Sequence, residues 1–343
     1  MAPTLHGKSP AIAPGSLVLV TGVNGYIASH VADQLIQAGY RVRGTARDTS
    51  KTAWVSELFD KRYGEGKFEP AIVGDMAEPG AFDEATQGVS GVVHVASVVT
   101  FDHDPNKVIP QVIAGAVNAI EAAAKTPSVK RFVYTSSSTA ITAPRPNEKY
   151  DLKVEDWNTA DVEAAWKPPP YEPTRNWAVY GASKTQAEQA IWKFAKEKKP
   201  DFVVNAVLPN ANIGEILSEK QPASTGAWAK ALYYGGLDKV KDIPPQWMVN
   251  VKDTARIHVS ALIDADVENE RILAYAYPFN WNDILASLRS LYPDKTFNED
   301  IPNAPRDLSI VDNSRGAELL RAHGREGWTS LEESVKDNTI DLK

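Results

Sequence analysis

A glycine turn between a short apolar run and an amphipathic segment does most to constrain how this chain can fold. Leu17–Val20 is continuously apolar, as expected of a strand buried in a parallel sheet, and it leads into Thr21-Gly-Val-Asn-Gly-Tyr-Ile-Ala28. Apolar residues at helical spacing follow. Gly22 would permit the tight turn, and Gly25 would let the backbone approach a pyrophosphate that the N–H groups of the helix start then face. Ordinary strand–turn–helix units that bind nothing are the alternative interpretation.

The end of the next predicted strand bears on which dinucleotide would bind. Residues 40–46 are predicted to form this strand, which is followed by Arg47-Asp48 with Lys51 nearby. NAD sites usually place a carboxylate about 20 residues after the glycines, whereas a planar, permanently charged guanidinium suits a 2′-phosphate. Arg47 therefore predicts NADPH/NADP+ as the cofactor. Two alternatives stay open: Asp48 could bind a ribose 2′-OH, or the basic residues could be solvated surface charges.

Strand and helix patterns alternate along the first two thirds of the chain. Further strands are predicted at residues 68–73, 91–97, 131–135 and 203–208, with a helix at 108–124. This alternation indicates an α/β fold, a Rossmann-type doubly wound parallel sheet. Ligands of such sheets bind outside the carboxyl ends of the strands, so residues at those ends should converge on one crevice. These residues are Gly22, Arg47, Asp75, Ser97, Ser137 and Pro209.

The pattern changes after Pro209, where short helices such as 281–291 and 331–340 are predicted. We expect a loose tail at residues 1–14 and a dinucleotide-binding domain at 15–209 and 246–275. Residues 210–245 and 276–343 would form a smaller, mostly helical substrate-binding lobe. Residues 140–178 are rich in Pro and charge and are predicted to be a long excursion that borders the substrate cleft.

Tyr180 and Lys184 lie four residues apart in a predicted helix, so their side chains share one face. A carbonyl that receives a hydride at carbon develops negative charge on oxygen and needs a proton donor there. A tyrosine can donate, and a nearby ammonium would lower its pKa from about 10. Serines after the 131–135 strand could orient the carbonyl. Because Tyr and Lys also occur at this spacing by chance on solvated helices, the argument depends on their position before the 203–208 strand and on the serine cluster.

The motifs Thr21-Gly-Val-Asn-Gly-Tyr-Ile-Ala28, Thr135-Ser-Ser137 and Tyr180-Gly-Ala-Ser-Lys184 resemble the extended short-chain dehydrogenase/reductase family. Within it the chain resembles the NADPH-dependent aldehyde and carbonyl (keto ester) reductases of fungi, relatives of dihydroflavonol reductases. Segments such as Arg43-Gly-Thr-Ala-Arg47, Pro244-Pro-Gln246 and Leu291-Tyr-Pro-Asp-Lys-Thr-Phe297 extend the likeness over about residues 15–336. The resemblance implies stereoselective reduction of aldehydes, keto esters and aryl ketones to alcohols.

The resemblance also implies a role for individual residues. Tyr180 would be the proton donor, Lys184 would bind the nicotinamide ribose, and Ser137 would orient the carbonyl, with Ser136 and Ser138 as alternatives. The residues expected to hold the cofactor are Thr21, Gly22, Asn24, Gly25, Tyr26, Ile27, Arg47, Lys51, Asp75, Met76, Ala96, Ser97, Tyr180, Lys184, Pro209 and Asn210. The residues expected to line the substrate pocket are Phe101, Trp177, Trp228 and Gln246. Core packing is an equal alternative for each of these aromatic residues.

Composition excludes several other classes of protein. The net charge of −7 and pI of about 5.5 argue against a nucleic acid or an anionic membrane as partner. The absence of cysteine excludes disulfides and thiol chemistry, and the six histidines show no metal-ligand spacing, so no metal is expected. His94 is interpreted as structural. We therefore expect a cytoplasmic enzyme, monomeric or homodimeric, acting on a small carbonyl compound.

Two other functions on the same fold remain open. A sugar-nucleotide epimerase or dehydratase would need basic residues in the small lobe, where Lys220, Lys230, Lys239 and Lys241 occur. A non-catalytic NADP-binding sensor would have no use for Tyr180 and Lys184.

Overall fold

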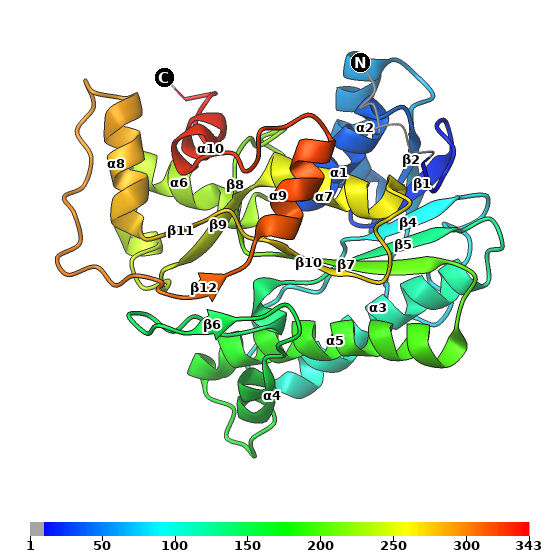
Figure 1. The fold of residues 1–343 in the computed structure, drawn as a ribbon, viewed down its shortest axis with the longest axis horizontal. Coiled ribbons are helices and arrows are strands. Elements are labelled where there is room, and N and C mark those ends of the chain that lie inside the picture. The colour runs from blue at the N-terminus through cyan, green and yellow to red at the C-terminus, as the bar shows by residue number, and fades with distance from the viewer. Residues whose placement is uncertain (1–9, 343) are drawn as a thin grey trace.

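A seven-stranded, all-parallel sheet forms the centre of the computed structural model, which describes residues 10–342 (Figure 1). From edge to edge the strands are β10 (Arg271–Ala274), β7 (Val203–Pro209), β5 (Arg131–Thr135), β4 (Gly91–His94), β1 (Leu17–Val20), β2 (Arg41–Ala46) and β3 (Phe68–Ile72). The chain first builds outward from β1 to β3 and then in the opposite direction from β4 to β10. This reversal of strand order between β1 and β4 is typical of a doubly wound sheet, so the predicted Rossmann-type fold is confirmed.

Helices cover both faces of this sheet. One face carries α1 (Tyr26–Gln37), α2 (Thr49–Tyr63) and α7 (Val251–Ile263), and the other carries α3 (Pro105–Ala124) and α5 (Asn176–Lys198). Side chains alternate along β1 and so contribute to the core on each face of the sheet. Val18 and Val20 join the core beneath α1, α2 and α7, while Leu17 and Leu19 join the core beneath α3 and α5. All four side chains are buried, which explains why the strand reads as a continuous apolar run.

The smaller lobe is mostly helical, as expected, and also contains a short three-stranded sheet that was not predicted. Its helices are α6 (Ala227–Tyr233), α8 (Trp281–Leu291) and α10 (Leu331–Asn338), and its sheet has the order β11 (Tyr277–Phe279), β9 (Gln246–Asn250) and β8 (Ala211–Ile213). The prediction that 246–275 returns to the main sheet holds for β10 and is wrong for β9, whose backbone pairs with β8 and β11. Strand patterning cannot say which sheet a strand will join.

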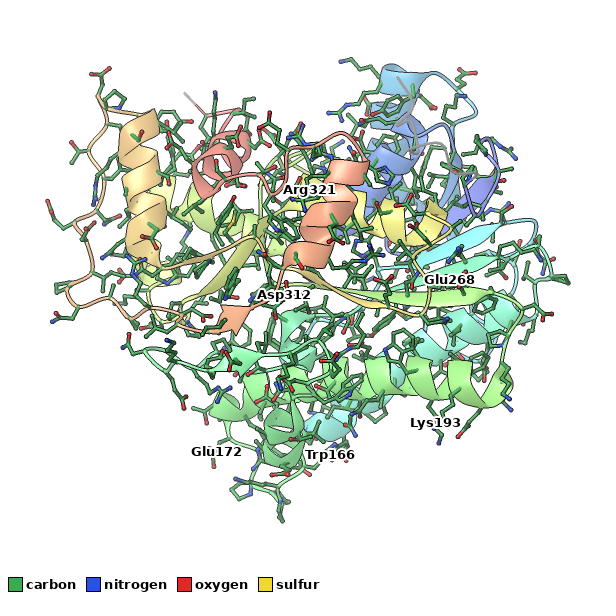
Figure 2. All side chains as sticks on the ribbon, viewed as in Figure 1. Trp166, Glu172, Lys193, Glu268, Asp312 and Arg321 are labelled. Carbon is green, nitrogen blue, oxygen red and sulfur yellow. The ribbon has the colours of Figure 1, made fainter. Side chains whose placement is uncertain are left out.

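The 140–178 excursion is built into the fold at several points. It contains β6 (Asp151–Leu152), which pairs with β12 (Ile310–Val311), then α4 (Thr159–Ala165), which packs on α5, and the short turn η2 (Pro173–Arg175). The tip of the excursion, marked by Trp166 and Glu172, lies at the lower edge of the molecule in Figure 2. The other elements are η1 (Ser138–Ala140), η3 (Ser224–Gly226), η4 (Leu237–Lys239) and α9 (Ser314–Ala322).

The predicted N-terminal tail is only partly within the described residues, since residues 1–9 lie outside them. Residues 10–14 are not loose. The Ala11 N–H donates to the Ile263 carbonyl at 2.8 Å, and Tyr40 Oη donates to the Ile12 carbonyl at 3.0 Å. Ile12 is buried in the core beside α7. The buried Ile12 side chain and these two hydrogen bonds together hold the segment against the core.

Candidate active site

The glycine turn lies at the reversal point of the sheet, between the ends of β1 and β4. Gly22 has φ +66°, and a Cβ there would lie 3.1 Å from the Ala96 Cα, so both its conformation and its surroundings require glycine. Buried Thr21 ties the two strand ends together, because its Oγ1 accepts from the N–H groups of Val95 and Ala96, both at 3.0 Å. Within the described chain, no side chain caps α1 at Gly25, which leaves the helix start open to an anion.

A pocket of about 300 Å³ opens beside this turn, where β2 leads into α2. Its lining residues are Asn24, Arg47, Ser50, Lys51, Trp54, Lys220 and Pro222. Asp48, the rival to Arg47, faces other partners: it caps α2, accepting from the Lys51 N–H and from Ser50 Oγ. The structure thus brings three of the predicted cofactor residues, Asn24, Arg47 and Lys51, together around a cationic pocket.

Other predicted cofactor residues lie at neighbouring strand ends. Asp75 is exposed and bonds the Ala77 N–H, while Met76 packs against Gly115 of α3. Ser97 follows β4, and its Oγ is buried without a hydrogen-bond partner among the described residues. Asn210 follows Pro209, the last residue of β7. Tyr26 is turned inward, with Oη donating to the Gly214 carbonyl at 2.8 Å, and Ile27 packs against the core, so their side chains serve the fold.

Tyr180 and Lys184 lie one turn apart in the first half of α5, as predicted. Lys184 is buried, and its Nζ donates to the Thr135 carbonyl at the end of β5 at 3.1 Å. Ser137 has a side-chain hydrogen bond with Tyr180 and caps η1, accepting from the Thr139 N–H at 3.2 Å. Lys184 and Ser137 thereby bring the end of β5 against the helix.

The three serines after β5 face different partners. Ser136 Oγ donates to Glu188 Oε2 at 2.6 Å inside the core. Ser138 lies near the hydroxyl of Tyr275, which is buried and has no hydrogen-bond partner among the described residues. Ser137 is therefore the one of the three that has a hydrogen bond with Tyr180.

Burial is the main influence on both ionisable groups of the α5 pair. It raises the pKa of Tyr180, against which the hydrogen bond with Ser137 acts, and it lowers the pKa of Lys184 to about 8, against which Glu188 acts. We expected the Lys184 ammonium to lower the pKa of Tyr180, but burial, which raises this pKa, has the larger effect. The physical reason is that removing water from a phenol disfavours its charged form, while Lys184 is directed at a backbone carbonyl.

Of the four residues predicted to line the substrate pocket, two lie against Tyr180. The Phe101 ring centroid is 5.2 Å from that of Tyr180 and 5.0 Å from that of Trp177, and Phe101 and Trp177 are 40% and 48% exposed. Trp228 instead packs edge-on to Trp281 in the small lobe, at 5.4 Å. Gln246 begins β9, and its amide donates to the Pro244 carbonyl.

Sequence reasoning missed the roles of two residues around this site, Glu188 and Lys220. Glu188 is completely buried one turn beyond Lys184 and pairs with Arg271 of β10, Nε to Oε1 at 2.7 Å. Its spacing of four from Lys184 and eight from Tyr180 was a usable signal. Lys220, interpreted as a solvated charge, lines the cationic pocket beside Arg47. His94 is structural as interpreted: it is buried, contacts Thr21 Oγ1 at 3.0 Å, and burial lowers its pKa to about 3.

No group of three or more His, Asp or Glu side chains within residues 10–342 is arranged to hold a metal ion. None of the described helices combines the length and the apolar character needed to cross a bilayer.

A family model described as the NAD dependent epimerase/dehydratase family matches residues 18–232. The chain belongs to this family. This confirms the resemblance to extended short-chain dehydrogenase/reductases. Aldehyde reductase 2 of Sporidiobolus salmonicolor is 46% identical over 331 residues, which cover 95% of this chain and 96% of the relative. The NAD-dependent epimerase/dehydratase terH of Aspergillus terreus is 42% identical over 333 residues, covering 96% and 97%.

Solved structures share the fold. The yeast methylglyoxal/isovaleraldehyde reductase Gre2, complexed with NADPH, superposes with a TM-score of 0.79 at 24% identity. The match covers 95% of this chain and 98% of Gre2.

Proposed function

We propose that this protein is an NADPH-dependent reductase that converts aldehydes and ketones, including keto esters and aryl ketones, to alcohols. The observation that carries the proposal is the arrangement of Ser137, Tyr180 and Lys184 beneath exposed aromatic rings. The aldehyde reductase named above is similar over nearly the whole chain, which supports the same class of reaction. The partner would be a small carbonyl compound.

The residues present fit a dinucleotide with a 2′-phosphate. Gly22 and the start of α1 would hold the pyrophosphate, and Arg47 and Lys51 would bind the 2′-phosphate. The unpartnered, buried Ser97 Oγ fits a polar group at the carboxyl end of β4. NADPH supplies the hydride when it is bound.

The proton chemistry belongs to the chain itself. Because burial raises the pKa of Tyr180, its hydroxyl keeps its proton at neutral pH and can donate it to a carbonyl oxygen. Ser137, hydrogen-bonded to Tyr180, would orient that oxygen. Lys184, with its pKa near 8, is mostly charged at pH 7 and favours the phenolate left after the transfer. Phe101 and Trp177 would pack against the apolar part of the substrate.

The sugar-nucleotide alternative is less well supported by the lysines of the small lobe. Lys230 pairs with Asp341 at 2.7 Å, and Lys241 pairs with Asp238 at 2.8 Å. Lys220 lines the pocket beside Arg47. Two of the four basic side chains expected to bind a sugar diphosphate are therefore neutralised by carboxylates of the lobe itself.

The test follows NADPH consumption by absorbance with an aryl ketone or a 4-halo-3-oxobutanoate ester, in parallel with NADH. We expect fast oxidation of NADPH and slow oxidation of NADH. In Tyr180→Phe, kcat should fall by about 100- to 10,000-fold, the range for general acid catalysis. NADPH binding, measured by calorimetry, should be kept.

Tyr234→Phe is the matched control, since Tyr234 is 70% exposed and lies in the small lobe. Near-normal turnover in Tyr180→Phe would refute the mechanism. Tight NADPH binding without turnover on any carbonyl would favour the epimerase or sensor alternatives.

A further inference from the structure

The segment of residues 214–222, which we call the lobe strap, crosses from the small lobe onto the start of α1. Three hydrogen bonds hold it there. Tyr26 Oη donates to the Gly214 carbonyl at 2.8 Å, and the His30 ring contacts the Glu215 carbonyl at 2.9 Å. Gln221 Nε2 donates to Ser29 Oγ at 2.5 Å. The strap is thus fixed to the helix whose first turn follows the glycine turn.

Gln221 also shapes the strap itself. Its side chain is buried, and its Oε1 accepts from the Leu217 N–H at 2.7 Å, which closes a short loop. Because Gln221 is anchored at α1, the residues on either side of it, Lys220 and Pro222, are brought to the pocket at the β2–α2 corner. A lysine of the substrate lobe therefore lies beside Arg47 and Lys51, about 170 residues away in the sequence.

The charges around this pocket are not balanced. No carboxylate of residues 10–342 forms an ion pair with Arg47, Lys51 or Lys220; the charge of Asp48 attracts Lys51, but its carboxylate is turned to the start of α2, which it caps. Other cations near the strap are paired, as Lys252 is with Glu215 at 3.0 Å. Three like charges gathered around about 300 Å³ repel one another unless an anion lies between them.

We propose that Lys220 is a third cationic contact to the 2′-phosphate of the cofactor, so that discrimination between NADP and NAD depends on the substrate lobe as well as on the β2–α2 corner. This inference rests on the proposed NADPH dependence and goes beyond it. Lys220 is exposed, so water screens part of its attraction for the phosphate. Removing one exposed, charge-assisted contact should weaken binding by about five- to tenfold.

The experiment compares two nucleotides that differ only in the 2′-phosphate, adenosine 2′,5′-bisphosphate and 5′-AMP, by calorimetry on the full chain. In Lys220→Ala, the Kd of the bisphosphate should rise by about five- to tenfold while that of 5′-AMP is unchanged. The loss should shrink as salt concentration rises, and Lys220→Arg should retain most of the affinity. KM for NADPH should follow the Kd, with KM for NADH unchanged.

Lys239→Ala is the matched control, because Lys239 is an exposed lysine of the same lobe outside the pocket. It should leave both nucleotides unaffected. If Lys220→Ala binds the bisphosphate like the wild type while Arg47→Ala does not, the role of Lys220 is refuted and the proposed function stands. If the wild type binds the bisphosphate no more tightly than 5′-AMP, and Arg47→Ala does not change either Kd, the NADPH assignment itself fails.

Discussion

Glu188 provides the sharpest test of how the active-site helix is held. Its carboxylate is completely buried and fully bonded: Oε1 accepts from Arg271 Nε at 2.7 Å and from Trp192 Nε1 at 3.0 Å. Oε2 accepts from Ser136 Oγ at 2.6 Å and from a second Arg271 nitrogen at 3.2 Å. The ion pair joins α5, one turn beyond Lys184, to the edge strand β10. Glu188→Ala would leave the Arg271 guanidinium, whose side chain is only 11% exposed, without its counter-charge.

The size of the stability loss in Glu188→Ala depends on the contacts that Arg271 retains. Removing one partner of a buried ion pair destabilises a protein by about 3–5 kcal/mol. Arg271 would still donate to the carbonyls of Val154 and Asp156 and lie 4.0 Å above the Trp157 ring. We therefore expect the free energy of unfolding to fall by an amount in the lower half of that range, about 3–4 kcal/mol. For a chain of this length the unfolding entropy is about 0.7 kcal/mol/K, so Tm should fall by about 4–6 °C.

The assay is urea unfolding followed by circular dichroism, with Tm measured by calorimetry at a fixed scan rate. The double variant Glu188→Leu/Arg271→Met should lose less stability than Glu188→Ala, because it removes both charges and leaves neither without its partner. A loss below about 1 kcal/mol in Glu188→Ala would mean that water reaches the pair, and our account of the site would be wrong. A double variant as unstable as the sum of its singles would contradict the coupling between the two residues.

Two further predictions concern stability. In Gly44→Ala the new Cβ would lie 2.5 Å from Phe68 Cε2 and 2.7 Å from Val23 Cγ1, so the free energy of unfolding should fall by about 1–3 kcal/mol. Urea midpoints test this against Gly74→Ala, whose Cβ meets nothing within 4 Å; equal midpoints would contradict it. Burial raises the pKa of Asp161 from 3.8 to about 6, so the folded protein holds the neutral carboxyl more readily than the unfolded chain does. The stability that this provides is fully present below pH 3.8 and is lost as pH rises through 6. Asp161→Asn should therefore gain stability relative to the wild type as pH rises from 4 to 6, and a gap that stays constant with pH would refute this.

Much of the fold could be predicted because its signals are local. The apolar run of β1 and the turn at Gly22 depend on neighbours in sequence, and the predicted bounds of β5 and α8 match the structure. The lobe was predicted less well. The pattern of β9 resembles any half-buried strand, and its place in the small sheet was decided by pairing with β8 and β11.

In the candidate site, too, some features could be predicted from the local sequence and others depended on packing between distant segments. The helical repeat alone set Tyr180 and Lys184 on one face of α5, since residues four apart always meet there. Which serine faces Tyr180 depended on how β5 packs against α5, and this turned Ser136 toward Glu188.

The sequence by itself determined the strand–turn–helix that can hold a dinucleotide and the pair of side chains that can transfer a proton. Backbone periodicity and the conformational freedom of glycine are properties of a few adjacent residues. The tertiary structure decided the contacts between distant segments. It paired Glu188 with Arg271 across 83 residues, and it brought Lys220 to the pocket at Arg47. Such contacts form because a folded chain must bury apolar surface and satisfy buried charges together, and no local pattern records which distant partner will do so.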